Sequence, residues 1–130
     1  MSVILLDTCT LLWLVIDPDR LSEAARKDIA SAGDFAWVSA ISAWEISWKH
    51  RCGKLELKLM PDAWWPRALA QHALQELPIS AAIALRSATL PSLHRDPADR
   101  FLIATAQEHN LVLLTPDPAI QQYPDLKSRW

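Results

Sequence analysis

The chain has 130 residues, of which 51% are hydrophobic, so it is long enough to bury one core and fits a single domain, residues 1–130. Its net charge of −2 is not that of a protein that coats long nucleic acid, and its two cysteines exclude a disulfide framework. The longest apolar run, residues 11–16, is too short to span a bilayer and follows no basic region, so we expect a cytoplasmic protein without a signal peptide.

The first half of the chain alternates short apolar runs with helical patterns. Ser22 is a good N-cap for a helix that ends near Gly33, and Gly53 marks the end of a later helix. The pattern predicts strands at residues 3–6 and 35–39 and helices at residues 11–16, 23–31 and 41–51.

The second half continues this alternation. Pro61 suits the first turn of a helix, and Asp96 followed by Pro97 is typical of an N-cap and the first helical residue. We expect no fifth strand at residues 125–130, where the strand pattern is missing. Together these elements predict an α/β fold, a three-layer α/β/α sandwich with a central, mainly parallel sheet. The predicted helices are residues 61–69, 80–88 and 97–109, and the predicted strands are residues 74–77 and 111–114.

Four carboxylates stand beside strongly apolar stretches: Asp7, Glu45, Asp99 and Asp117. Asp7 and Asp117 follow predicted strands, and the other two lie in the early turns of helices that begin near the same edge of the sheet. Ligands bind at this edge in open parallel sheets, so the four side chains can converge. Crowded carboxylates resist joint ionisation, and a hard divalent cation removes that cost. The sequence therefore predicts a metal-dependent phosphoryl-transfer site.

Each acid also has an ordinary structural role, which the sequence leaves open. Asp7 could cap the following helix. Glu45 could complete a capping box with Ser42, although Ser39 competes as the cap. Asp99 could stabilise the first turn of its helix by facing the positive end of the dipole, and Asp117 could organise a turn. Asp96 could simply be an N-cap.

The order of the acids, with Asp96-Pro97-Ala98-Asp99-Arg100 and Thr115-Pro116-Asp117, resembles that of PIN-domain proteins. More narrowly, the chain is similar to the VapC-like toxins of type II toxin–antitoxin modules, from Val3 to about Tyr123. The resemblance implies a PIN-like fold, an endoribonuclease that depends on Mg²⁺ or Mn²⁺, a homodimer and a cognate antitoxin that inhibits it. It also implies that the catalytic and metal-binding residues are Asp7, Glu45, Asp99 and Asp117.

Other residues are weaker candidates for the site. Thr8 and Thr115 could hold a carboxylate or a water molecule, and Thr115 matches the threonine of the family's Thr-x-Asp motif. Asp96 could join the acids, and Arg100 could meet substrate phosphate or pair with a neighbouring acid. Basic residues also gather at 49–58 and 94–100, where the first cluster is equally consistent with a solvated helix end.

Seven tryptophans are a surplus of large apolar side chains for a chain of this length. Trp44 and Trp48 are one helical turn apart and share a face. Most of the tryptophans suit the core or a subunit interface, so they favour a homodimer.

Two other kinds of function compete with a nuclease. One is a non-catalytic PIN-like module for RNA binding or assembly, against which the retention of all four acids argues. The other is an α/β phosphatase or receiver domain. A phosphatase would have an acid where Cys9 stands, and a receiver would have an acidic pair before the first helix. Neither Cys9 nor Cys52 has the spacing to arginine that a cysteine phosphatase requires, so both are expected to be reduced thiols.

Overall fold

The computed structural model describes residues 3–93 and 96–130. Five parallel strands form one sheet in the order β3-β2-β1-β4-β5. The strands are β1 (Ile4–Leu6), β2 (Ala36–Ser39), β3 (Gln75–Leu77), β4 (Val112–Leu114) and β5 (Lys127–Arg129). The central strand, β1, pairs with one strand from each half of the chain, because Ile4 lies opposite both Ala36 and Val112.

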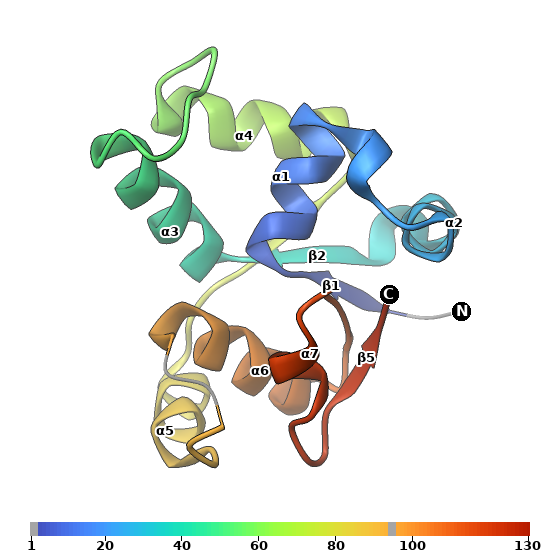
Figure 1. The fold of residues 1–130 in the computed structure, drawn as a ribbon, viewed down its shortest axis with the longest axis vertical. Coiled ribbons are helices and arrows are strands. Elements are labelled where there is room, and N and C mark those ends of the chain that lie inside the picture. The colour runs from blue at the N-terminus through green and yellow to red at the C-terminus, as the bar shows by residue number, and fades with distance from the viewer. Residues whose placement is uncertain (1–2, 94–95) are drawn as a thin grey trace.

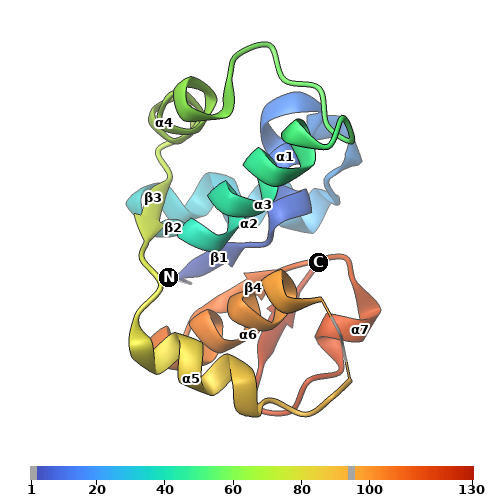
Figure 2. The same cartoon turned by 90° about the vertical axis from the view of Figure 1, so that its left-hand side faces the viewer.

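Helices cover both faces of this sheet (Figures 1 and 2). They are α1 (Thr8–Ile16), α2 (Glu23–Ala32), α3 (Ala40–Arg51), α4 (Pro61–Gln71), α5 (Ala81–Thr89), α6 (Pro97–His109) and α7 (Pro118–Gln121). Short 3₁₀ turns follow α1 and α2, at Pro18–Arg20 and Gly33–Phe35. The predicted three-layer α/β/α sandwich with a parallel sheet is confirmed.

Alternating side chains of β1 build two separate cores. Ile4 and Leu6 face the layer that contains α1, α3 and α4, where Leu11, Ile46 and Trp64 are buried against them. Leu5 faces the opposite layer, built from α6 and α7. A strand between two layers is apolar on both faces, which explains the uninterrupted run at residues 3–6.

The C-terminal strand is a correction to the sequence analysis. We expected no strand at residues 125–130, but β5 pairs with β4 in parallel, with Lys127 opposite Val112. Its residues are polar because β5 forms the edge of the sheet and is held by backbone hydrogen bonds. A turn was one alternative role for Asp117, but the segment after this residue forms the short helix α7, with Asp117 as its N-cap.

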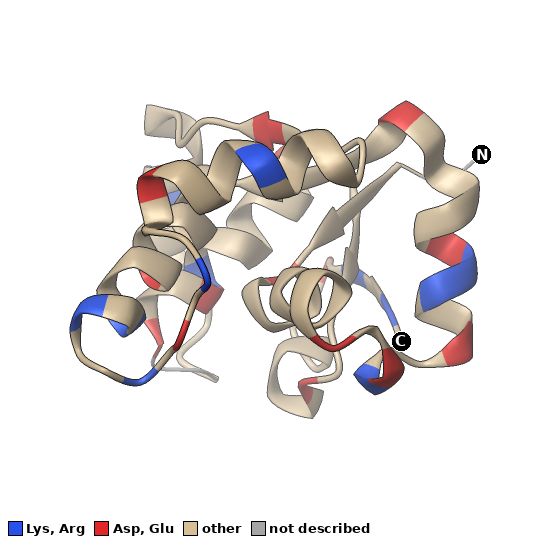
Figure 3. Ribbon diagram, turned by 90° about the horizontal axis from the view of Figure 1, so that it is seen from above, with Lys and Arg blue, Asp and Glu red and all other residues tan. Residues whose placement is uncertain are grey.

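Charged residues are mixed over the surface. The loop between α3 and α4 carries basic and acidic residues in alternation, at Lys54, Glu56 and Lys58 (Figure 3). Within residues 3–93 and 96–130, no helix has the length and apolar character needed to cross a membrane.

Candidate active site

Asp7 lies at the junction between β1 and α1. Its carboxylate caps α1 by accepting a hydrogen bond of 2.8 Å from the backbone N–H of Thr10, and the Cys9 thiol donates to the same oxygen at 3.4 Å. The side chain is only 4% exposed. Burial raises the pKa of Asp7, and hydrogen bonds from Thr10, Thr115 and Cys9 oppose that rise only in part. The ionised carboxylate is therefore costly to the fold unless a positive charge is near.

The Cys9 thiol is a hydrogen-bond donor to this carboxylate. Its pKa is raised by burial and, next, by the charge of Asp7, so the thiol stays protonated at neutral pH. This state suits a donor and does not suit a nucleophile.

Glu45 lies on the second turn of α3, with its side chain almost completely buried. One carboxylate oxygen, Oε2, pairs with Lys49 Nζ at 3.2 Å. The other, Oε1, is buried and has no hydrogen-bond partner among the described residues. A buried carboxylate oxygen without a partner is uncommon and indicates a ligand that the protein atoms alone do not supply.

The alternative role of Glu45 in a capping box is not found. Ser39 caps α3, accepting a hydrogen bond of 3.1 Å from the N–H of Ile41. Ser42 is instead engaged by Thr8, because the two hydroxyl groups share a buried hydrogen bond of 2.8 Å. This bond joins α1 to α3 beside Asp7 and Glu45.

Three more acids lie at helix starts. Asp96 caps α6 through the N–H of Ala98 at 2.9 Å, and Asp99 occupies the first turn of the same helix. Asp117 caps α7 through the N–H of Ala119, also at 2.9 Å. The capping roles of Asp96 and Asp117 are compatible with a place in a site, because a carboxylate that caps a helix still has lone pairs to offer.

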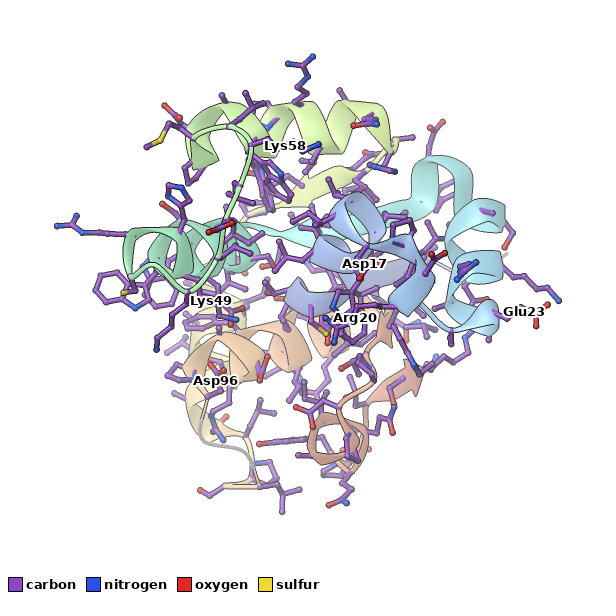
Figure 4. The ribbon with its side chains drawn as sticks, turned by 45° about the horizontal axis from the view of Figure 1, so that its top comes forward. Asp17, Arg20, Glu23, Lys49, Lys58 and Asp96 are labelled. Atoms are coloured by element: carbon purple, nitrogen blue, oxygen red, sulfur yellow. The ribbon has the colours of Figure 1, made fainter. Side chains whose placement is uncertain are left out.

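All five acids line one pocket of about 170 Å³ at the carboxyl ends of the central strands. Lys49 extends from α3 toward the start of α6, where Asp96 lies (Figure 4). The structure thus brings together the four acids predicted from the sequence, with Asp96 and Thr8 beside them. The lining residues are Asp7, Thr8, Cys9, Glu45, Lys49, Asp96, Asp99, Asp117 and Ile120.

The residues of this pocket fit a hard divalent cation. Carboxylate and hydroxyl oxygens are the ligands preferred by Mg²⁺ and Mn²⁺. A cation in the pocket would stabilise both Glu45 Oε1, which has no partner among the described residues, and the buried carboxylate of Asp7. As placed, no three His, Cys, Asp or Glu side chains of the described residues are gathered closely enough to hold a metal ion. The acids therefore surround the pocket without forming a closed set of ligands.

Two predicted residues lie outside the pocket lining. Thr115 is fully buried behind Asp7, and its hydroxyl accepts a hydrogen bond of 3.2 Å from the N–H of Asp117. The guanidinium of Arg100 donates to the carbonyl oxygens of Ser87 and Leu90 at 2.9 and 2.8 Å, near the end of α5. The basic residues His94 and Arg95 lie outside the described residues.

Sequence reasoning did not single out Lys49 or Cys9 as part of the site. In the sequence, Lys49 belongs to the basic cluster at residues 49–58, but its position four residues after Glu45 is also the spacing of a helical ion pair. Nothing in the sequence around Cys9 indicates that its thiol points back to Asp7.

Comparison with known proteins relates this site to a family. The PIN domain model matches residues 4–126. "Ribonuclease VapC22" of Mycobacterium tuberculosis is 36% identical over 124 residues, which are 95% of this chain and 93% of that protein.

Solved structures share the fold. The chain matches a structure of VapBC2 from Rickettsia felis bound to a promoter DNA fragment, with a TM-score of 0.73, 15% identity and coverage of 97% and 96% of the two chains. It matches DNA-bound VapBC from Salmonella typhimurium with a TM-score of 0.74, 17% identity and coverage of 99% and 98%. At these identities the likeness concerns the fold alone.

Proposed function

The chain belongs to the PIN-domain family, and from that premise we propose that it is an endoribonuclease acting as the toxin of a type II toxin–antitoxin module. The single observation that carries the proposal is the pocket into which Asp7, Glu45, Asp99 and Asp117 converge. The reaction is hydrolysis of an RNA phosphodiester bond.

In this proposal the four acids hold Mg²⁺ or Mn²⁺. When bound, such a cation neutralises charge on the phosphate and lowers the pKa of a water molecule. The protein's own contribution is to keep the acids in place. The N–H of Thr10 and the Cys9 thiol fix the orientation of the Asp7 carboxylate, and Thr115 holds the backbone of Asp117.

The bond between Thr8 and Ser42 has a related role. It is buried, and it joins the helix that follows Asp7 to the helix that carries Glu45. Two acids that repel each other are thereby kept at one separation, so little rearrangement is needed when substrate and cation bind.

The test is cleavage of a structured RNA by the purified protein. We expect cleavage with Mg²⁺ or Mn²⁺, none in EDTA, and a loss of about 100-fold or more in rate for Asp99→Asn, because a lost ligand removes several kcal/mol of charge stabilisation. Asp62→Asn is the matched control, since Asp62 is an exposed acid in the first turn of another helix, α4. RNA binding without cleavage under any of these conditions would favour the non-catalytic module.

We also propose an antitoxin partner that places an arginine in the acid pocket. A guanidinium group forms bidentate hydrogen bonds with carboxylates, and its positive charge would take the place of the divalent cation. At the far end of α1, a groove of about 640 Å³ is lined by apolar residues that include Ile16, Leu57 and Trp64. Since α1 has nine residues and is only about 13 Å long, one short segment can reach both places.

A further inference from the structure

Lys49 is the one basic residue among the described residues that line the acid pocket. It stands one helical turn after Glu45, and its ammonium group lies 3.2 Å from Glu45 Oε2. The two side chains differ in exposure, at 43% for Lys49 and 11% for Glu45. The lysine therefore reaches the pocket from the solvent side, while the glutamate lies inside.

The pairing places two cations in competition for one carboxylate. Lys49 holds one oxygen of Glu45, and the other oxygen is buried without a hydrogen-bond partner. A divalent cation among the acids would attract Glu45 and repel the ammonium group, since both interactions grow as the separations shrink. The cation must then draw Glu45 away from Lys49 or share it.

We propose that Lys49 is a tethered counter-ion, which gives up Glu45 when the divalent cation enters and then binds a phosphate of the RNA. The proposal rests on the proposed ribonuclease function. A phosphodiester that approaches five carboxylates needs positive charge beyond that of the divalent cation. Lys49 is the basic residue of the described pocket lining, and its long, flexible and partly exposed side chain can turn to the phosphate. An ion pair that only supports the helix would not change the affinity for metal or RNA in this manner.

The first test is calorimetric titration of Mn²⁺ into the metal-free protein and its variants. Lys49→Met removes the competing charge, so we expect the Mn²⁺ dissociation constant to fall about threefold to tenfold. Lys49→Arg keeps the charge and should bind Mn²⁺ no more tightly than the wild type. Lys54→Met is the matched control, because it removes an exposed lysine outside the pocket, and its dissociation constant should stay within about twofold of the wild type.

The second test is steady-state cleavage at saturating Mn²⁺. Lys49→Met should raise the KM for RNA about tenfold, as expected for the loss of one phosphate contact. Lys49→Arg keeps the charge, so its KM should stay close to that of the wild type. The thermal midpoints of all three variants are measured to show that they fold. Equal Mn²⁺ affinity in Lys49→Met and Lys54→Met, or an unchanged KM in Lys49→Met, would overturn the proposal. A wild type that neither binds Mn²⁺ nor cleaves RNA would instead overturn the ribonuclease function.

Discussion

Asp7 has two roles that make opposite demands on its carboxylate. As the N-cap of α1 it accepts a hydrogen bond from the N–H of Thr10, which favours the ionised form. Its burial favours the neutral form and decides the balance, since the pKa of Asp7 is raised. In the protein without metal, the ionisation of this residue therefore works against folding.

Asp7→Asn should make the metal-free protein more stable at neutral pH. The folded pKa of Asp7 lies above its ordinary value of 3.8, so the stability that the acid contributes is complete below that value and is lost as the pH rises through the folded pKa. Asparagine keeps the helix cap but does not ionise. The gain in thermal midpoint over the wild type should be absent near about pH 4 and grow toward about pH 8, measured in EDTA.

Added Mg²⁺ or Mn²⁺ should make the wild type more stable than Asp7→Asn. A ligand that binds only the folded state raises its thermal midpoint, and Asp7→Asn should gain less from the cation than the wild type. The variant should also lose most RNA cleavage. An Asp7→Asn protein that is less stable than the wild type at neutral pH in EDTA would contradict the assigned cost of the buried charge.

Single residues of the site were predictable where the chain itself sets their position. Asp7 and Asp117 follow apolar strands, which sequence patterns locate well. Which serine caps α3 was not predictable, because both Ser39 and Ser42 have acceptable capping positions. The choice depends on Thr8, which lies 34 residues from Ser42 in sequence, so the capping-box alternative for Glu45 stayed open. The same holds for Arg100, whose carbonyl partners belong to the segment around the end of α5.

At the scale of elements, the buried strands were easier to predict than the C-terminal edge strand, β5. β1 and β4 consist of apolar residues in the middle of the sheet and were expected near their observed positions. β5 has the sequence Lys-Ser-Arg and is largely exposed at the edge of the sheet. It was missed because such a strand has no apolar pattern. It is fixed by contacts that the sequence does not show, including the N–H of Thr115 donating to the carbonyl of Arg129 at 3.1 Å.

The start of α6 offers a way to separate a helix cap from a metal ligand. Asp96→Asn keeps the cap, so its free energy of unfolding should match that of the wild type. If Asp96 only borders the metal site, the cleavage rate should also stay within about threefold of the wild type. Asp96→Ala loses the hydrogen bond to the N–H of Ala98 and should cost about 1 kcal/mol of stability. Chemical denaturation and RNA cleavage are measured on both variants. A large loss of cleavage in a stable Asp96→Asn protein would add Asp96 to the metal ligands.

At the scale of the whole molecule, α3 presents an unusual surface. Trp44 and Trp48 are 57% and 53% exposed, and their rings are parallel within 3° with centroids 6.4 Å apart. Two large aromatic side chains side by side on a surface are typical of the centre of an interface. We propose that this face of α3 contributes to a homodimer.

Sedimentation at micromolar concentration tests the dimer. We expect the wild type to be a dimer and Trp44→Glu with Trp48→Glu to raise the dimer dissociation constant at least about 30-fold, because each charge would be buried against the partner. Leu85→Glu is the matched control, since Leu85 is the more exposed apolar residue, at 70%, and lies on α5. A wild-type monomer of 14.6 kDa would rule out the homodimer.

The order of strands in the sheet also controls when the pocket can exist during synthesis. β1 is made first, yet one of its two neighbours is β4, near the other end of the chain, and Asp117 follows β4. A chain still attached to a translating ribosome folds from its N-terminal side, and until β4 emerges it carries Asp7 without Asp117. The acids can therefore meet only after β4 and Asp117 have emerged from the ribosome. In this topology the pocket is complete only after β4 and the segment that carries Asp117 have folded against β1.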